Sequence, residues 1–264
     1  MAYETPAIKG AHVYQHLGAY STYISDSSGE TRMPIADDIR TNAAVRSAPM
    51  GLAFEQGVAT YVFKKVLAVP TQISLHVRDR GEGLNGIVST TNLIRLGRTT
   101  IVTDGVIVDE ADPSRKIAYG YITWAVLGDA PTPGEPPVIP EREPGRPGII
   151  EALGITALPD GNGCRLEGVS SQIAGPGGIL HAGMFQMLSE EAALVAARTA
   201  SGSDRAWATD CTYNFLQPGR VGPFVATAEA LYQSDQGVDV KVTIRDEGSD
   251  GRIGCVSFLR VRTD

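Results

Sequence analysis

The sequence has little of what several common protein classes require. No apolar run approaches the roughly 18 residues that a membrane-spanning helix needs. Only three cysteines occur, Cys164, Cys211 and Cys255, and no two of them form a CxxC pair. Their odd number and the lack of a signal-peptide pattern argue against a disulfide framework. We therefore expect a soluble, cytoplasmic protein that does not bind membranes.

Basic residues and histidines are also scarce. Lys and Arg number 23 against 30 Asp and Glu, which gives a net charge of −7 and argues against general nucleic-acid binding. The four histidines show no zinc-ligand spacing with cysteine or aspartate, so we expect no metal site. No G-x-S-x-G motif is present, and an α/β-hydrolase triad is therefore unsupported.

Glycine and proline are concentrated in one stretch, DAPTPGEPPVIPEREPGRPG at residues 129–148. Such a run buries little and donates few backbone hydrogen bonds, which is typical of an extended linker. It divides the chain nearly in half. We predict an N-terminal domain at residues 1–130, a linker at 131–148 and a C-terminal domain at 149–264.

The two halves have the same order of elements. Each begins with a turn-rich lead-in and continues with an apolar helix, predicted at residues 51–67 and 179–200. Alternating and β-branched residues then predict four strands in each half. These strands span residues 71–77, 86–96, 99–110 and 116–127 in the first half and 207–216, 224–232, 238–247 and 253–261 in the second.

Landmark residues of the two halves keep a nearly constant offset, which indicates an internal duplication. Glu55 and Glu190 differ by 135 positions, and Asp109 and Asp246 differ by 137. One helix followed by a run of strands favours an α+β fold, with an antiparallel sheet wrapped round each helix. Two such sheets can pair edge to edge as a pseudo-dimer, which covers otherwise open strand edges.

The most informative stretch is GPGGILHAGMFQMLSEEAA, where a glycine-rich turn runs into the second helix. The free N–H groups of a helix start, here at His181, Ala182 and Gly183, can hold a carbonyl oxygen that becomes negative in a transition state. Glu190 and Glu191 follow, and a carboxyl on an apolar helix can have the raised pKa that acid–base chemistry uses. Alternatively, His181 only caps or packs the helix and the two glutamates lie on a solvated face.

This stretch resembles the helix signature of hotdog-fold acyl-CoA thioesterases of the phenylacetyl-CoA thioesterase type, H-G-G-x-x-x-x-L-x-[D/E]-x-A. Ala182 replaces the first glycine, and the other signature positions match at His181, Gly183, Leu188, Glu190 and Ala192. The strand CTYNFLQPGRVG resembles the one that follows in that family. The resemblance covers most of both halves, apart from the linker and the first 40 or so residues.

The resemblance implies a double hotdog with active sites where the two halves meet. The acid on one helix would face a thioester carbonyl held at the start of the other helix. In the first half Glu55 has the matching position, but Arg46 stands in place of the histidine, and Ser47 and Ala48 replace the two glycines. Two unequal pairings follow, Glu55 with the turn at residues 181–183 and Glu190 with the turn at residues 46–51. The sequence does not choose between them.

The resemblance also implies the reaction and the roles. An acyl-CoA thioester would be hydrolysed to a free acid and CoA, with Glu55 or Glu190 as base or nucleophile. The backbone at Ala182 and Gly183 would polarise the carbonyl, and His181 would orient that turn. No metal or redox cofactor is needed, since coenzyme A is part of the substrate. Such a pseudo-dimer is also compatible with further assembly into a homo-oligomer.

The anionic part of CoA requires cations near the surface. Arg98, in a predicted hairpin turn, and Arg220, after a Pro-Gly pair, are candidates for contacting the CoA phosphates. A solvated turn arginine explains each of them equally well.

Two alternative functions stay open. One is a 3-hydroxyacyl or 2-enoyl thioester dehydratase or hydratase, which is also a hotdog enzyme with a helix glutamate. That reaction pairs the glutamate with a separate histidine, and the sequence shows no convincing histidine opposite Glu190. The other is a non-catalytic acyl-CoA-binding protein, which the imperfect turn of the first half would suit.

Overall fold

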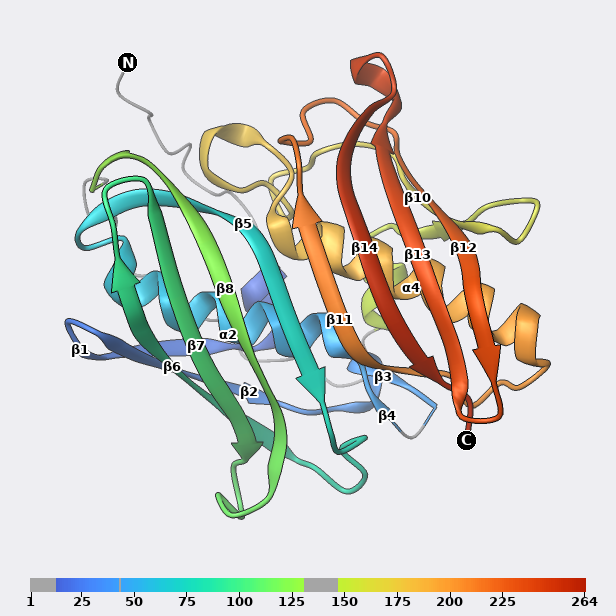
Figure 1. Ribbon diagram of the computed structural model, residues 1–264, viewed down its shortest axis with the longest axis horizontal. Helices are drawn as coiled ribbons and strands as arrows, with labels where there is room; N and C mark the ends of the chain where they lie inside the picture. The colour runs from blue at the N-terminus through green and yellow to red at the C-terminus, as the bar shows by residue number, and fades with distance from the viewer. Residues whose placement is uncertain (1–12, 43, 131–146) are drawn as a thin grey trace.

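The structure is a computed structural model that describes residues 13–42, 44–130 and 147–264. The predicted linker at 131–148 lies outside the described residues, except for its last two. Twelve of the described strands run antiparallel in one continuous sheet, and two short ones pair separately. Behind the large sheet lie two long helices, α2 (Ser47–Val62) and α4 (Ala182–Ser201) (Figure 1).

Six strands of each half pack round the helix of that half. The first half contributes β1 (Tyr20–Ser25), β2 (Ser28–Pro34), β5 (Val66–Val77), β6 (Gly86–Leu96), β7 (Thr100–Asp109) and β8 (Lys116–Asp129). The second contributes β9 (Thr156–Ala157), β10 (Gly163–Leu166), β11 (Trp207–Phe215), β12 (Phe224–Ser234), β13 (Gly237–Asp246) and β14 (Arg252–Arg262). Their order across the sheet is β1-β2-β6-β7-β8-β5-β11-β14-β13-β12-β10-β9.

Shorter elements connect these parts. They are α1 (Val13–Leu17), β3 (Arg40–Thr41), β4 (Ala44–Val45), α3 (Ile149–Ala152) and the 3-10 turns Asp37–Ile39, Pro176–Gly178 and Glu247–Ser249.

The two halves join at β5 and β11. These strands pair antiparallel from His76 opposite Asp210 to Gln72 opposite Asn214. The expected edge-to-edge pairing is therefore confirmed, and the chain is an α+β double hotdog. Pairing these edges gives their backbone N–H and C=O groups partners inside one molecule.

Both helices are buried on nearly all sides, as their uniformly apolar sequences predict. Each is covered by its own part of the sheet and also touches the other helix. At one contact, a Cβ atom added to Gly183 would lie only 2.0 Å from Leu52 Cδ2. The helix glutamates Glu55 and Glu190 are enclosed with the apolar side chains and are 5% and 0% exposed.

The structure corrects two predicted segments. The first helix was expected at 51–67, but it begins at Ser47 and ends at Val62, and Val66 already pairs with Asp129 in the sheet. Pro49 fits the first helical turn, where an N–H group would have no partner. The apolar run after the helix is the start of strand β5, in which Val66 and Leu67 are partly buried, and apolar periodicity alone does not separate a short strand from a helix.

The lead-in of the first half is not merely turn-rich, since it contains the hairpin of β1 and β2. Its polar pattern differs from that of an apolar strand because only alternate residues of β2 are buried. The strands β9 and β10 were missed because they are only two and four residues long. All eight predicted strands are present, and the hairpin turns expected at Gly97 and Gly237 are confirmed.

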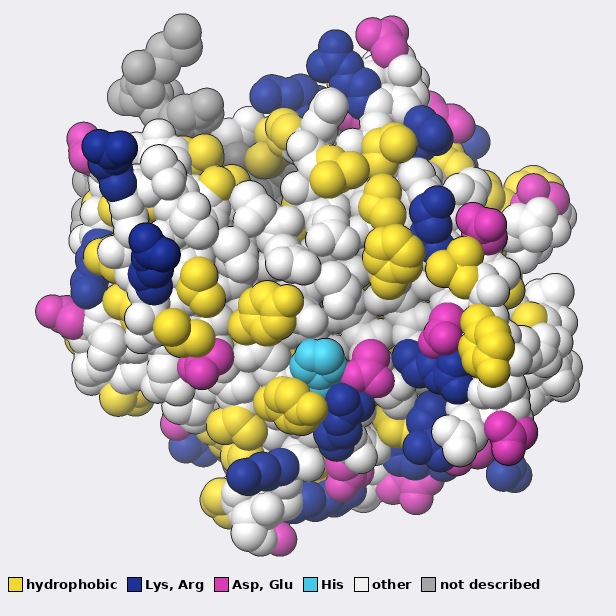
Figure 2. Space-filling view, viewed as in Figure 1, with side chains coloured by type: hydrophobic (Ala, Val, Ile, Leu, Met, Phe, Trp, Pro, Cys, Tyr) yellow, Lys and Arg dark blue, Asp and Glu magenta, His cyan; other side chains and the backbone are white. Residues whose placement is uncertain are grey.

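The face drawn in Figure 2 shows hydrophobic side chains in separate groups, with surface between them that is neither hydrophobic nor charged. Tyr119, Tyr121 and Phe258 are among the exposed large residues. All three cysteines are buried and free. Within the described residues, no helix is long and apolar enough to cross a membrane.

Candidate active site

Helix α4 begins at a tightly held turn. His181 is its N-cap, and the Nδ1 atom of that ring accepts a hydrogen bond from the Gly183 N–H at 3.0 Å. The His181 N–H donates to Ile173 O at 2.9 Å, and the Leu180 N–H donates to Gly219 O at 2.8 Å. These contacts fit the predicted role of His181 in orienting the turn. They also assign the ring's tautomer, because a neutral ring that accepts at Nδ1 carries its proton on Nε2.

Glu55 of α2 faces this turn from the other half. Its Oε1 atom lies 3.9 Å from His181 Nε2, and its Oε2 atom accepts from Gln186 Nε2 at 3.5 Å. Neither distance is that of a short, charge-assisted hydrogen bond. Burial raises the pKa of the Glu55 carboxyl to about 8, so a large fraction of it is protonated at neutral pH.

The backbone donors of the turn differ in availability. The Gly183 N–H is engaged by the His181 ring, and the Met184 N–H donates to His181 O. In the part of the chain that the structure describes, the Ala182 N–H donates to no other group. Of the two predicted carbonyl donors, Ala182 is therefore the one that is available in this arrangement.

Tyr14 belongs to the same cluster, and sequence reasoning did not find it. Its hydroxyl lies 3.1 Å from His181 Nε2, and the two rings meet edge to face with centroids 5.1 Å apart. Burial raises the pKa of Tyr14, and the nearby Glu55 raises it further. Tyr14 lies on the short helix α1, far in sequence from any motif, so no sequence signal points to it.

In the second pairing, Glu190 also faces the start of α2, but here the carboxyl is bonded directly to the helix start. Glu190 Oε1 accepts from the Ser47 N–H at 2.6 Å and from the Ser47 hydroxyl at 2.8 Å, and Oε2 accepts from the Ala48 N–H at 3.3 Å. The Glu190 carboxyl thus caps α2, and it occupies the N–H groups that would otherwise hold a substrate carbonyl oxygen.

Arg46 completes this second pairing. Its Nη1 atom lies 4.0 Å from Glu190 Oε2 and donates to Glu191 Oε2 at 2.8 Å. Burial raises the pKa of Glu190, and Arg46 and the Ser47 donors act in the opposite direction. Glu191, a candidate for a surface residue, is a half-buried partner of Arg46.

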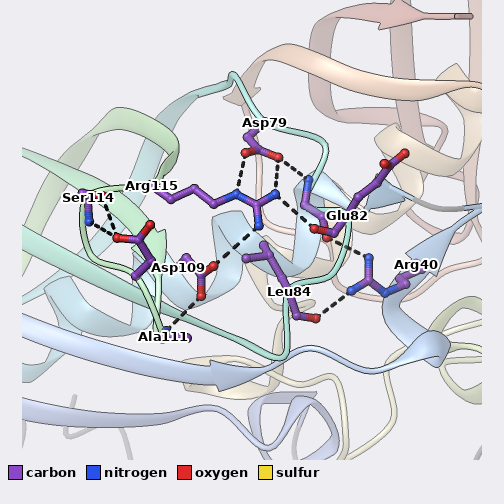
Figure 3. A network of polar contacts seen from close by, with 10 residues as sticks. Arg40, Asp79, Glu82, Leu84, Asp109, Ala111, Ser114 and Arg115 are labelled. Atoms are coloured by element: carbon purple, nitrogen blue, oxygen red, sulfur yellow. Dashed lines mark hydrogen bonds and ion pairs between the residues drawn. The ribbon is translucent and has the colours of Figure 1, made fainter.

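A polar network holds the loop between β5 and β6 and links it to Arg40 of β3 (Figure 3). Arg115 bonds both carboxylate oxygens of Asp79, at 2.7 and 2.9 Å, and the same carboxylate accepts from the Gly81 N–H. Arg40 donates to Gly81 O and Leu84 O, which ties the loop after β5 to the segment that leads into α2. Arg115 and Arg40 thus hold this loop from two sides, which is consistent with a structural role for the N-terminal end of α2.

The two candidate CoA-binding arginines differ in position. Arg220 is exposed, and its backbone N–H donates to Asp246 Oδ2; its neighbour Gly219 bonds the turn that leads into α4. Arg98 is exposed in the turn between β6 and β7, and the described structure shows no contact between it and Glu55 or Glu190. The backbone next to Arg220 is therefore linked to the turn before α4, whereas no contact of the described residues links Arg98 to either glutamate.

Two surface hollows of about 420 and 210 Å³ lie away from both glutamates. The larger is lined by Arg40, Asn42 and the loop before β6, and the smaller by residues at the ends of β5, β11 and β14. Neither lining includes Glu55 or Glu190, so the hollows do not mark the predicted acyl site.

Comparison with known proteins agrees with this fold. Residues 177–252 match the family model "Thioesterase superfamily", and this stretch contains His181, Gly183 and Glu190. No curated protein sequence matches the chain. Because the family match covers less than half of the sequence, the solved structures supply the evidence for the whole fold.

Two similar solved structures cover nearly the whole chain. A putative thioesterase from Novosphingobium aromaticivorans is 14% identical, with a TM-score of 0.64 over 92% of this chain and 98% of that one. The acyl-CoA thioesterase II TesB2 from Mycobacterium marinum is 11% identical, with a TM-score of 0.64 over 96% and 98%. The chain thus has the double-hotdog fold of thioesterase II proteins. These matches do not single out the phenylacetyl-CoA type.

Proposed function

We propose that the protein hydrolyses an acyl-CoA thioester at Glu55, and that Glu190 is a structural cap. The observation that carries the proposal is the contrast between the two carboxyls. Glu190 accepts three hydrogen bonds from Ser47 and Ala48, whereas Glu55 has no short contact and faces a helix start with a free N–H.

The Glu55 site can supply the parts that thioester hydrolysis needs. The Ala182 N–H donates to the thioester carbonyl oxygen, and the N-terminal end of the helix stabilises the negative charge that develops there. Ionised Glu55 takes a proton from water as the water oxygen bonds to the carbonyl carbon. When the tetrahedral intermediate collapses, the C–S bond breaks and the CoA thiolate takes the proton from Glu55.

Glu55 can also act as the nucleophile. Its carboxylate oxygen then attacks the carbonyl carbon, CoA leaves as the thiolate, and water hydrolyses the resulting anhydride. A single turnover in H₂¹⁸O, with enzyme in excess, separates the two routes. Only the nucleophilic route can leave ¹⁸O in the Glu55 side chain, which mass spectrometry of the peptide detects.

The test of the function is thiol release from a panel of aliphatic and aryl acyl-CoAs by wild type, Glu55→Gln and Glu190→Gln. We expect Glu55→Gln to lose about 100-fold or more of kcat/KM, the usual contribution of a positioned base. Glu190→Gln should keep most of its turnover per folded molecule. Full activity in Glu55→Gln, or loss of activity only in folded Glu190→Gln, would show that the proposed site is wrong.

One observation favours a second candidate, thioester dehydration or hydration. Those reactions pair a helix glutamate with a histidine, and His181 Nε2 lies 3.9 Å from Glu55 Oε1 across the junction of the halves. The expected histidine thus faces Glu55 rather than Glu190. Hydration of a 2-enoyl-CoA, followed by the loss of enoyl absorbance, distinguishes this function from hydrolysis, which releases a thiol.

A further inference from the structure

Gly51 and Gln186 occupy equivalent positions on the two central helices. Their numbers differ by 135, as do those of the helix caps Arg46 and His181 and those of the two glutamates. The two residues also face each other, since a Cβ atom on Gly51 would lie 2.0 Å from Gln186 Oε1. A residue that touches its own counterpart lies at the centre of the repeat, where one side chain can serve only one of the two sites.

The side chain of Gln186 extends toward Glu55. It is completely buried, and its Nε2 atom donates to Glu55 Oε2 at 3.5 Å. Its Oε1 atom has no hydrogen-bond partner among the described residues. A buried amide oxygen without a partner is unfavourable, because it has lost its hydrogen bonds to water, and an apolar side chain of the same length avoids that cost. Packing alone therefore does not account for a glutamine here.

Gly51 provides the space for that amide. Any larger residue would meet the Gln186 side chain, and glycine inside a helix is itself unfavourable relative to alanine. Because Gly51 has no side chain, Glu190 receives no equivalent amide. The Gly51–Gln186 pair is thus an asymmetric feature that two identical subunits could not have.

We propose that Gln186 is a positioning residue of the Glu55 site, and that Gly51 is required for its placement. When Glu55 is ionised, the Gln186 amide N–H stabilises the carboxylate and restricts its rotamer, which aims it at the substrate carbonyl. The other polar groups that face Glu55 are His181 Nε2 and, through that ring, the Tyr14 hydroxyl. The inference rests on the proposed function of Glu55.

The first test is Gln186→Met, which keeps the length of the side chain and removes the amide. We expect a folded protein with a Tm equal to or above that of the wild type, since the unpartnered oxygen is gone. At pH 7, kcat should fall about tenfold with little change in KM. The rising limb of the kcat–pH profile should move to higher pH, because the carboxylate loses a donor.

The second test, Gly51→Ala, leaves every functional group in place and moves only the amide. It should reproduce the fall in kcat and the shift of the limb. Gly57→Ala is the matched control on the same helix. Its Cβ would lie 3.1 Å from Thr91 Oγ1, away from Gln186, so it should keep wild-type kinetics.

The outcomes separate the inference from the function on which it rests. If Gln186→Met and Gly51→Ala both keep the wild-type kcat and pH limb while Glu55→Gln is inactive, Gln186 only packs and the inference is wrong. If Glu55→Gln keeps full turnover, the proposed function fails and the inference fails with it. If Gln186→Met does not fold, the comparison of Gly51→Ala with Gly57→Ala decides.

Discussion

Glu55 and Glu190 are the same residue type at the same position of equivalent helices, yet their surroundings differ. Donors from the opposite half are bonded to Glu190, whereas Glu55 has only long contacts. The residue facing each glutamate explains the difference. The turn that faces Glu190 gives up its N–H groups to it, while the His181 ring takes the Gly183 N–H and keeps Glu55 apart from the helix start.

The pH dependence of turnover follows from the state of Glu55. As a base or a nucleophile it must be ionised, and burial raises its pKa to about 8. We therefore expect log kcat/KM to rise with pH from 6 and to level off above about 8. Rates of acyl-CoA hydrolysis are measured across this range after subtraction of hydrolysis by hydroxide alone. A limb near pH 4.5 would instead indicate a solvated carboxylate.

The same burial predicts a pH-dependent stability. The pKa of Glu55 is about 8 in the folded state and 4.5 in its ordinary state, so its contribution to stability is full below pH 4.5 and lost as pH rises through 8. Glu55→Gln cannot ionise. The variant should gain about 4 kcal/mol in unfolding free energy relative to wild type between pH 4.5 and 8. Urea denaturation at both pH values measures this, and a difference that is independent of pH would contradict it.

At the scale of elements, the sequence predicts which residues share a helix more readily than it predicts the packing between elements. The candidates at 181–183, Glu55 and Glu190 come from a motif resemblance and the internal repeat, and the structure places all of them on or at the start of the two central helices. Tyr14 and Gln186 were missed, because their roles arise from contacts between elements 131 or more residues apart. The hairpin of β1 and β2 was missed because β1 is largely exposed and β2 buries only alternate residues.

The start of α2 gives a prediction for a structural carboxyl. Glu190→Gln replaces one accepting oxygen of the cap with a donating amide nitrogen. The N–H of Ser47 or Ala48 then loses its acceptor, and the nearby Arg46 loses one negative charge. We expect a loss of about 3 kcal/mol in unfolding free energy. Glu191→Gln is the matched control. It removes the neighbouring carboxylate, which also pairs with Arg46 but is less buried, and should cost about 1 kcal/mol or less. Equal losses in the two variants would argue against the capping role.

At the scale of the whole molecule, the two halves share more than a sheet. Backbone pairing of β5 with β11 is reinforced on the outer face, where Asp210 accepts from His76 at 2.7 Å and from Arg78 at 2.8 Å. On the inner face the central helices touch, and the Glu55 site takes its carboxyl from one half and its helix start from the other. For the Glu55 site, the first half alone therefore supplies the carboxyl without the carbonyl donor, and the second half alone supplies the carbonyl donor without the carboxyl.

This division of the site predicts that the halves complement each other in trans. Fragments 1–130 and 149–264, expressed separately, should each show no thioesterase turnover, because Glu55 and the residues 181–183 are then on different chains. Expressed together, they should associate through the β5–β11 seam and the apolar contact of the helices, and activity should return. Combining a Glu55→Gln first fragment with a wild-type second fragment controls for activity from Glu190 alone, and it should give none. Turnover by the second fragment on its own would mean that a dimer of that half forms a working site, and that Glu190 can leave its capping role when the start of α2 is absent.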